Sequence, residues 1–311
     1  MPRYHVHRSI QINSTPEKVF AAVADYGTWT TWSPWLCAEP SAQVEVSKNP
    51  SSVGSTYSWK GDLVGEGELE HRQLHPNRLI EDEIHFVKPF KSQSQVSFEI
   101  EPAGEGTNIT WHMHGSLPWF LFWMRSQMAI FIGMDYERGL QMLKECMETG
   151  QILSTTKIRG IESVGPLQVV GVRSTCTMDD VGPSMETTFK EAMRLLPEHN
   201  LAIDGEMISV YHNTNLKSKT FDYTGGFVVP TSSAPLPDEL SSWQLPATRA
   251  LYVEHNGSYD NLGNAWSAAY QFARYKKLKQ TSSGTYEIYK NDPQNTEPAD
   301  LQTEIFLPLK S

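Results

Sequence analysis

The chain has 311 residues and a formal net charge of −10, with 39% apolar and 20% charged residues. Its 9 Trp, 12 Tyr and 12 Phe are more aromatic residues than a disordered chain carries, so we expect it to fold. Neither half has the clustered positive charge of a nucleic-acid-binding surface, which argues against direct nucleic-acid contact. The length suits two domains of about 150 residues each.

The cysteines and the lack of a signal sequence predict a cytoplasmic protein. Cys37, Cys146 and Cys176 are isolated, with no C-x-x-C pair, as expected in a reducing compartment. The N-terminal segment lacks the apolar core of a signal peptide. The most lipophilic stretch, 117–134, contains Arg125, whose insertion into a bilayer would cost about 2.5–3.5 kcal/mol. We therefore expect a buried helix there and no membrane span.

The first half has the pattern of a sheet followed by a helix. Residues 3–13 alternate between apolar and polar side chains, which predicts a half-buried strand. The segment Ser14-Thr15-Pro16-Glu17 then predicts a helix start with a capping hydroxyl. Residues 119–148 lack proline and have apolar side chains at helical spacing, which predicts one long helix. Between them, turn residues separate six predicted antiparallel strands: 43–47, 55–60, 64–73, 78–87, 92–101 and 107–116.

Three segments of this half carry a family resemblance: INSTPEKVFAAVADYGTWTTWSPW, GSTYSWKGDLVGEGELE and ITWHMHGSLP. They resemble the SRPBCC superfamily of START-like domains, close to its polyketide cyclase/dehydrase branch, over residues 3–148. The resemblance implies a helix-grip fold, in which a curved antiparallel sheet wraps a long C-terminal helix and leaves an apolar cavity. That superfamily includes carriers, co-chaperones and enzymes, so it implies no single chemistry.

Alternation along the strands gives a candidate lining for this cavity. The concave face is expected to carry Trp59, Phe86, Phe98, Trp111 and Met113, and the helix adds Phe131 and Met134. For any one of these side chains, simple core packing is the better interpretation. For the group, an apolar ligand pocket is expected once the fold is accepted.

The second half repeats itself after a polar connector at 150–156. The strand, helix and strand predicted at 167–173, 184–196 and 206–212 recur, about 80 residues later, at 249–255, 261–275 and 285–290. Such a repeat predicts two related halves about a pseudo-twofold axis, with joined sheets and helices on one face. The whole chain is therefore expected to be α+β, with domains at 1–149 and 157–311.

The second repeat and the end of the chain also carry a resemblance. ALYVEHNGSYDNLGNAW, YEIYKNDP and LQTEIFLPLK, with SVYHN and FDYTGGFVV in the first repeat, resemble the GyrI-like domain, also called the AraC-type effector-binding domain. The resemblance covers about 157–311 and implies binding of small, often cationic or aromatic compounds. Such domains usually accompany a DNA-binding domain, but here a helix-grip domain takes that place.

Glu304 is the leading candidate site residue of this half. Alternation places Glu304 and Phe306 opposite Ile305 and Leu307, so Glu304 faces the open side of the sheet if the apolar pair meets the helices. In the resembled family a glutamate at this position lies in the pocket. Four further residues are predicted to bind the ligand with it. Alternation puts Tyr252 and Glu254 on one face of their strand, and Ser209 and Tyr211 on one face of theirs. Aromatic walls around a carboxylate suit organic cations; the alternative is an ordinary exposed carboxylate.

These residues favour a protein that senses, carries or sequesters a hydrophobic or cationic aromatic small molecule. A hydrolase of reactive small molecules is the main alternative, with Glu304 and Tyr252 as candidate catalytic residues that activate water. An accessory transcriptional regulator acting through a separate DNA-binding partner is the third. The sequence requires no cofactor and leaves both homo-oligomerisation and the identity of the ligand open.

Two pairs of histidines lie on the polar faces of predicted strands. His5 and His7 belong to the first strand of the helix-grip sheet, and His112 and His114 to its last strand. Because these strands are neighbours in that fold, the four rings are expected to cluster on the convex surface, where imidazoles can bind zinc. A solvated face or a domain interface is the favoured interpretation, and we assign no metal.

Overall fold

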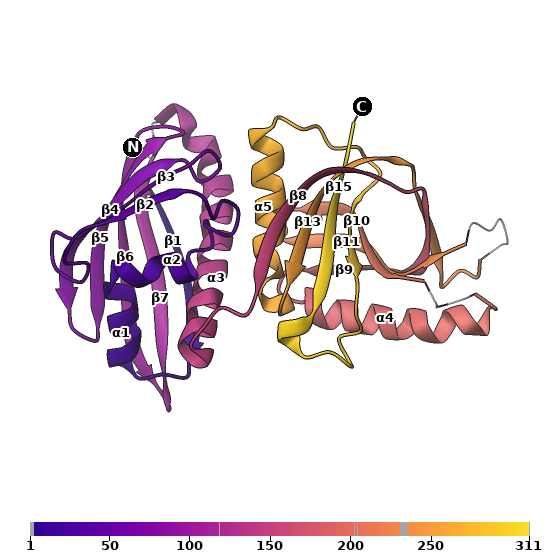
Figure 1. The fold of residues 1–311 in the computed structure, drawn as a ribbon, viewed down its shortest axis with the longest axis horizontal. Helices are drawn as coiled ribbons and strands as arrows, with labels where there is room; N and C mark the ends of the chain where they lie inside the picture. The colour runs from indigo at the N-terminus through magenta and orange to yellow at the C-terminus, as the bar shows by residue number, and fades with distance from the viewer. Residues whose placement is uncertain (1–2, 118, 202, 204, 231–235, 311) are drawn as a thin grey trace. The chain divides into compact units, whose positions relative to one another are not determined.

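The computed structural model describes residues 3–117, 119–201, 203, 205–230 and 236–310. The chain divides into two compact units, Met1–Thr155 and Thr156–Ser311 (Figure 1). Each unit combines one antiparallel sheet with helices, so the predicted α+β class is confirmed. No helix within the described ranges is long and apolar enough to cross a membrane.

The first unit is built on a seven-stranded sheet in the order β1-β7-β6-β5-β4-β3-β2. Consecutive strands from β2 to β7 pair with one another, and the first strand, β1, pairs with the last, β7, to form one edge of the sheet. The strands are β1 (Arg3–Ile12), β2 (Gln43–Val46), β3 (Thr56–Lys60), β4 (Glu66–His75), β5 (Leu79–Lys88), β6 (Ser92–Ala103) and β7 (Gly106–Ser116).

Helices cover the apolar face of this sheet. They are α1 (Pro16–Ala24), η1 (Tyr26–Thr28), α2 (Trp29–Trp32) and α3 (Arg125–Thr149), and the short η2 (Trp119–Met124) leads into α3. The long helix α3 packs on β1, while α1 packs on β5, β6 and β7. The expected meander and long final helix are thus confirmed, with strand ends shifted by a few residues. One expectation is wrong: Thr15 is the N-cap of α1, but its side chain makes no capping hydrogen bond.

The second unit contains an eight-stranded sheet made of two interlocked repeats. The first repeat is β8 (Thr155–Val164), β9 (Leu167–Thr177), α4 (Val181–Glu198), β10 (Met207–Asn215) and β11 (Thr220–Val229). The second is β12 (Ser241–Leu245), β13 (Thr248–Asn256), η3 (Tyr259–Asn261), α5 (Leu262–Tyr275), β14 (Thr285–Tyr289), η4 (Pro298–Asp300) and β15 (Gln302–Leu309).

The strand order β12-β9-β11-β10-β14-β15-β13-β8 reads as a mirrored pair of repeats. The central strands β10 and β14 pair directly, and each repeat gives its first strand to the outer edge of the other repeat. The predicted pseudo-twofold arrangement is therefore present. Three strands were not predicted: β8, which follows directly on the polar connector, β11, whose residues were noted only for their family resemblance, and β12, which is five residues long.

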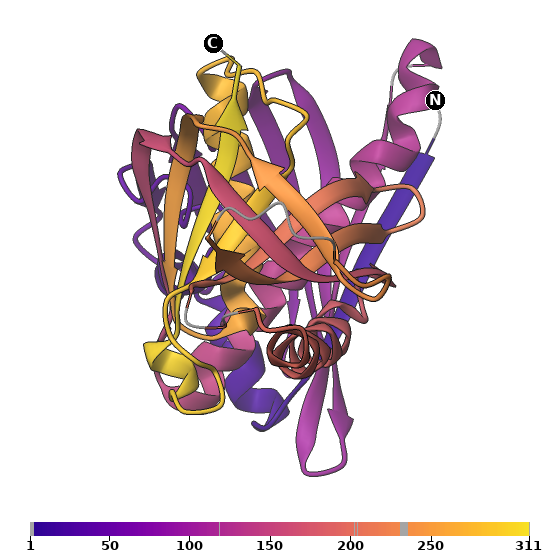
Figure 2. The same cartoon turned by 90° about the vertical axis from the view of Figure 1, so that its right-hand side faces the viewer.

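Both helices of this unit lie on one face of the sheet. Helix α4 packs on β9 and β11, and α5 packs on β13 and β15; Figure 2 views α4 nearly end-on beside the twisted strands. Gly225 on β11 permits the close approach of α4, since a Cβ there would lie 2.9 Å from the Thr188 methyl group. The central strands β10 and β14 are left between the two helices.

Candidate functional site

The candidate pocket residues of the first unit lie in two environments. Phe98, Trp111 and Met113 are buried in the core, whereas Trp59 and Phe86 are only partly buried. The Trp59 and Phe86 rings pack edge to face with centroids 6.0 Å apart. The first set therefore lies in the core of the unit, and the second set lies nearer its surface.

Trp111 lies at the centre of an aromatic cluster. Its ring stacks on Tyr136 of α3 at 4.0 Å, and Phe98 lies 4.8 Å away. Trp29 and Trp32 meet it edge to face from the segment after α1. Gly139 allows α3 to come this near, because a Cβ at that position would lie 2.8 Å from the Trp111 ring. Of the two expected helix residues, Met134 is partly buried, but Phe131 is 44% exposed.

A buried histidine–aspartate pair that the sequence did not reveal lies beside this cluster. His71 Nδ1 is 2.5 Å from Asp82 Oδ1, and both side chains are fully buried. His71 Nε2 is 2.9 Å from the carbonyl oxygen of Ala24, and the Tyr26 ring stacks on the imidazole at 3.9 Å. Both ring nitrogens therefore have a polar partner, although the ring is completely enclosed. This pair joins α1 to β4 and β5.

In the second unit, the structure bears out the alternation expected in the last strand. Ile305 and Leu307 pack against α5, and Glu304 and Phe306 face the opposite side of the sheet together with Tyr252. Phe306 stacks between Tyr252 and Tyr286, with both centroid distances 4.9 Å. The rings expected around Glu304 thus largely pack against one another.

Glu304 already has partners within the chain. Its carboxylate accepts a hydrogen bond of 3.0 Å from the Tyr252 hydroxyl and lies 3.7 Å from Lys290 Nζ. The same hydroxyl also lies 2.8 Å from Glu254, whose pKa is lowered chiefly by Arg159 at 2.6 Å. A polar depression of about 230 Å³ adjoins these groups and is lined by Glu254, His255, Asn256, Lys290, Gln302, Thr303 and Glu304.

A different glutamate, Glu287, lies on the helix side of the sheet. It belongs to the central strand β14, directly opposite Ser209 of β10, and is 1% exposed. Ser209 and Tyr211 face this side of the sheet, whereas Glu304 faces the other. The expectation that these ligand-binding candidates all surround Glu304 is therefore corrected. The pseudo-twofold axis passes between β10 and β14, which places Glu287 where both repeats meet.

Neutral donors surround the Glu287 carboxylate. It accepts hydrogen bonds from the Trp266 indole, the Tyr289 hydroxyl and the Tyr211 hydroxyl. Burial raises the pKa of Glu287, and these hydrogen bonds only partly oppose that shift. No lysine, arginine or histidine in the described ranges forms an ion pair with it. Uncompensated buried carboxylates are costly, by several kcal/mol per ion.

Side chains from α4 and η3 complete the surroundings of Glu287. The Tyr289 hydroxyl lies 3.1 Å from Ser209 Oγ and 3.5 Å from Met185 Sδ, and its ring meets Phe189 and Tyr259 edge to face. Trp266, Tyr211, Tyr259 and Met185 are partly exposed, whereas Glu287 is not. The carboxylate is thus enclosed by aromatic and apolar side chains that reach solvent.

Sequence reasoning missed Glu287 although a signal was available. In the segment TYEIY, alternation puts Tyr286 and Ile288 on one face and Glu287 and Tyr289 on the other. A glutamate inside a short aromatic strand is an unusual choice unless its face holds polar partners. One of those partners, Tyr289, lies in the same strand, but Trp266 and Tyr211 come from α5 and β10, and their proximity to Glu287 required the fold.

Comparisons with known proteins agree with this architecture. Residues 3–148 match the model of the family described as polyketide cyclase / dehydrase and lipid transport, and residues 160–310 match that of the GyrI-like small molecule binding domain. None of the curated proteins compared with the sequence matches it.

Solved structures similar to each half share low sequence identity with it. The Aha1 dimer from Colwellia psychrerythraea is 18% identical, over 47% of this chain and 98% of that one, with a TM-score of 0.36. The EcmrR C-terminal domain is 20% identical, over 51% and 99% of the two chains, with a TM-score of 0.38. The EcmrR–DNA complex is 20% identical, over 60% and 66%, with a TM-score of 0.42. The two family models together account for both units, and the chain is a fusion of a polyketide cyclase/dehydrase-type domain of the SRPBCC superfamily with a GyrI-like small molecule binding domain.

Proposed function

We propose that the second unit binds a lipophilic aromatic cation, with Glu287 as its counter-ion. The observation that carries the proposal is a buried carboxylate enclosed by aromatic rings and hydrogen-bonded to neutral donors. A cation beside it would offset the cost of burying the carboxylate and would be attracted by the faces of Trp266, Tyr211 and Tyr259.

The route of the ligand follows from exposure. Met185 on α4 and Trp266 on α5 are partly exposed and flank the carboxylate from the two repeats. A cation that enters between these helices displaces partly exposed side chains and leaves the packed cores under α4 and α5 in place. The proposal therefore requires rearrangement of only a few side chains.

Glu304 is the alternative centre, and its surroundings favour it less. Its carboxylate lies near Lys290 Nζ and accepts from Tyr252, and it is about a quarter exposed. A cationic ligand there would compete with an ammonium group that is already present. Hydrolysis with Glu304 and Tyr252 as catalytic residues stays a second candidate, and it requires a turnover assay.

Binding of tetraphenylphosphonium, measured by calorimetry with the full chain, tests the proposal. Glu287→Gln preserves shape and removes the negative charge that would attract the cation, whose phosphonium centre donates no hydrogen bond. We expect at least about tenfold weaker binding in Glu287→Gln and little change in the matched control Glu304→Gln. Equal affinity in all three proteins, or loss only in Glu304→Gln, would overturn the proposal.

A further inference from the structure

Four imidazoles gather on the outward face of the first unit's sheet. The register of β1 and β7 pairs His5 with His114 and His7 with His112. Their neighbours in sequence, Val6, Trp111 and Met113, point inward and are buried. The histidines therefore cannot contribute to the core, and the predicted cluster on the convex surface is present.

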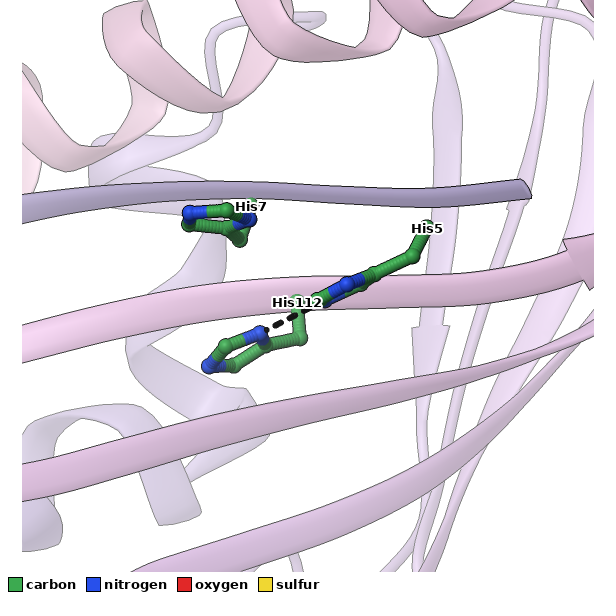
Figure 3. A group of neighbouring side chains, drawn as sticks. All are labelled: His5, His7 and His112. Atoms are coloured by element: carbon green, nitrogen blue, oxygen red, sulfur yellow. Dashed lines mark hydrogen bonds between the residues drawn. The ribbon is translucent and has the colours of Figure 1, made fainter.

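Three of these rings converge on one point (Figure 3). The ligand nitrogens of His5, His7 and His112 all lie within 4.8 Å of one another, and His5 Nε2 is 3.0 Å from His112 Nδ1. Zinc binds imidazole nitrogen at about 2.0–2.1 Å, which in a tetrahedral site separates two nitrogens by about 3.3 Å. The His7 side chain is exposed, so its ring is free to rotate toward this geometry when a metal binds.

Neighbouring side chains hold two of the rings in place. His114 stacks on His5 with centroids 4.0 Å apart and planes 10° from parallel. Glu99 Oε2 lies 3.5 Å from His112 Nε2, on the side of the ring away from His5. A carboxylate there favours hydrogen on Nε2 and leaves the Nδ1 lone pair free for a metal, as in many carboxylate–histidine–metal arrangements.

We propose that His5, His7 and His112 bind one divalent cation of the zinc type through their imidazole nitrogens. Imidazole donors suit Zn²⁺, Co²⁺, Ni²⁺ and Cu²⁺, whereas Mg²⁺ and Ca²⁺ prefer oxygen. Three protein ligands leave a further position for water, as in open zinc sites. This proposal replaces the expectation that the histidine face is only solvated, and it is independent of the ligand site at Glu287.

Calorimetric titration of the untagged, chelator-treated full chain with Zn²⁺ tests the site, since a polyhistidine tag would itself bind the metal. We expect one equivalent to bind. His5→Ala and His7→Ala should each weaken binding more than tenfold, and Glu99→Gln about tenfold, a typical loss when the partner of a metal-bound histidine is removed. Both mutated histidines are exposed, so these variants should fold, which circular dichroism verifies.

Two control variants separate a built site from scattered surface histidines. His75→Ala removes an exposed histidine outside the cluster and should leave zinc affinity unchanged. His114→Phe keeps the stack on His5 and should also bind zinc nearly as well as the parent. Absence of saturable binding, or an equal loss in His75→Ala, would overturn the site. A loss in His114→Phe as large as in His5→Ala would overturn the assignment of its three ligands. Co²⁺ should bind the same variants and give the visible absorption bands of a tetrahedral ion.

Discussion

Two buried carboxylates, Asp82 in the first unit and Glu287 in the second, lie in similar aromatic surroundings but differ in the side chains that bind them: an ionisable imidazole contacts Asp82, and among the described residues only neutral donors contact Glu287. Asp82 lies 2.5 Å from the His71 imidazole, whereas Glu287 accepts hydrogen bonds from an indole and two phenols. A buried charge with an internal partner fixes elements of the fold to one another. A buried charge without one costs stability and favours a ligand that brings the missing charge.

Removal of the internal partner should give the largest effect. His71→Leu leaves the Asp82 carboxyl group buried beside Tyr26 without its imidazole partner, and breaking a buried pair in this way typically costs about 3–5 kcal/mol. Urea unfolding of this variant should therefore show a large loss of stability in the first unit. A loss below about 1 kcal/mol would mean that the pair does not hold α1 to the sheet, and the contrast with Glu287 would disappear.

Removing the charge of Glu287 should instead increase the free energy of unfolding. Burial raises the pKa of Glu287 in the folded protein, so between its ordinary pKa and the raised value the folded state binds more protons than the unfolded state. Parent stability therefore falls as pH rises through this window, and Glu287→Gln does not share this fall. We expect the variant to be more stable by about 1–3 kcal/mol at neutral pH.

The difference between parent and Glu287→Gln should close in acid, below the ordinary glutamate pKa, where both side chains are neutral. Denaturant unfolding across a pH series measures it directly. A variant that is less stable than the parent at neutral pH would indicate that the carboxylate has an internal charge partner.

The smallest effect is expected at the third carboxylate, Glu304. Lys290→Met removes the ammonium group that lies 3.7 Å from Glu304 and also pairs with Glu206, and partly exposed pairs of this kind contribute about 1 kcal/mol or less each. We expect a correspondingly small change in unfolding free energy and no gain in tetraphenylphosphonium affinity. If the variant bound the cation more tightly, Glu304 would be a second cation site masked by Lys290.

The sequence predicted most of the fold because its patterns are local. Alternation located all the strands of the first unit and most of those of the second, and helical spacing located α3, α4 and α5. It also placed Glu304, Tyr252 and Phe306 on one face of the sheet. The strands β8, β11 and β12 were missed; β12, for example, has five residues with few apolar positions and carries little periodic signal.

The candidate site was harder to predict because its chemistry depends on contacts between distant segments. Glu304 and Glu287 belong to neighbouring strands, yet they face opposite sides of the sheet. Lys290 lies beside the first and Trp266 beside the second, and neither contact follows from sequence spacing. Only the pairing of strands and helices shows which carboxylate has a charged partner and which, among the described residues, has none.

A matched pair of ligands tests the central claim about Glu287 most directly. Phenyltrimethylammonium and tert-butylbenzene have nearly the same shape and differ in charge, so the ratio of their affinities, from equilibrium dialysis, isolates electrostatics from packing. We expect the parent and Glu304→Gln to prefer the cation by about tenfold or more, and Glu287→Gln to lose that preference. A preference for the cation that survives in Glu287→Gln would contradict the assignment of Glu287 as the ligand's counter-ion.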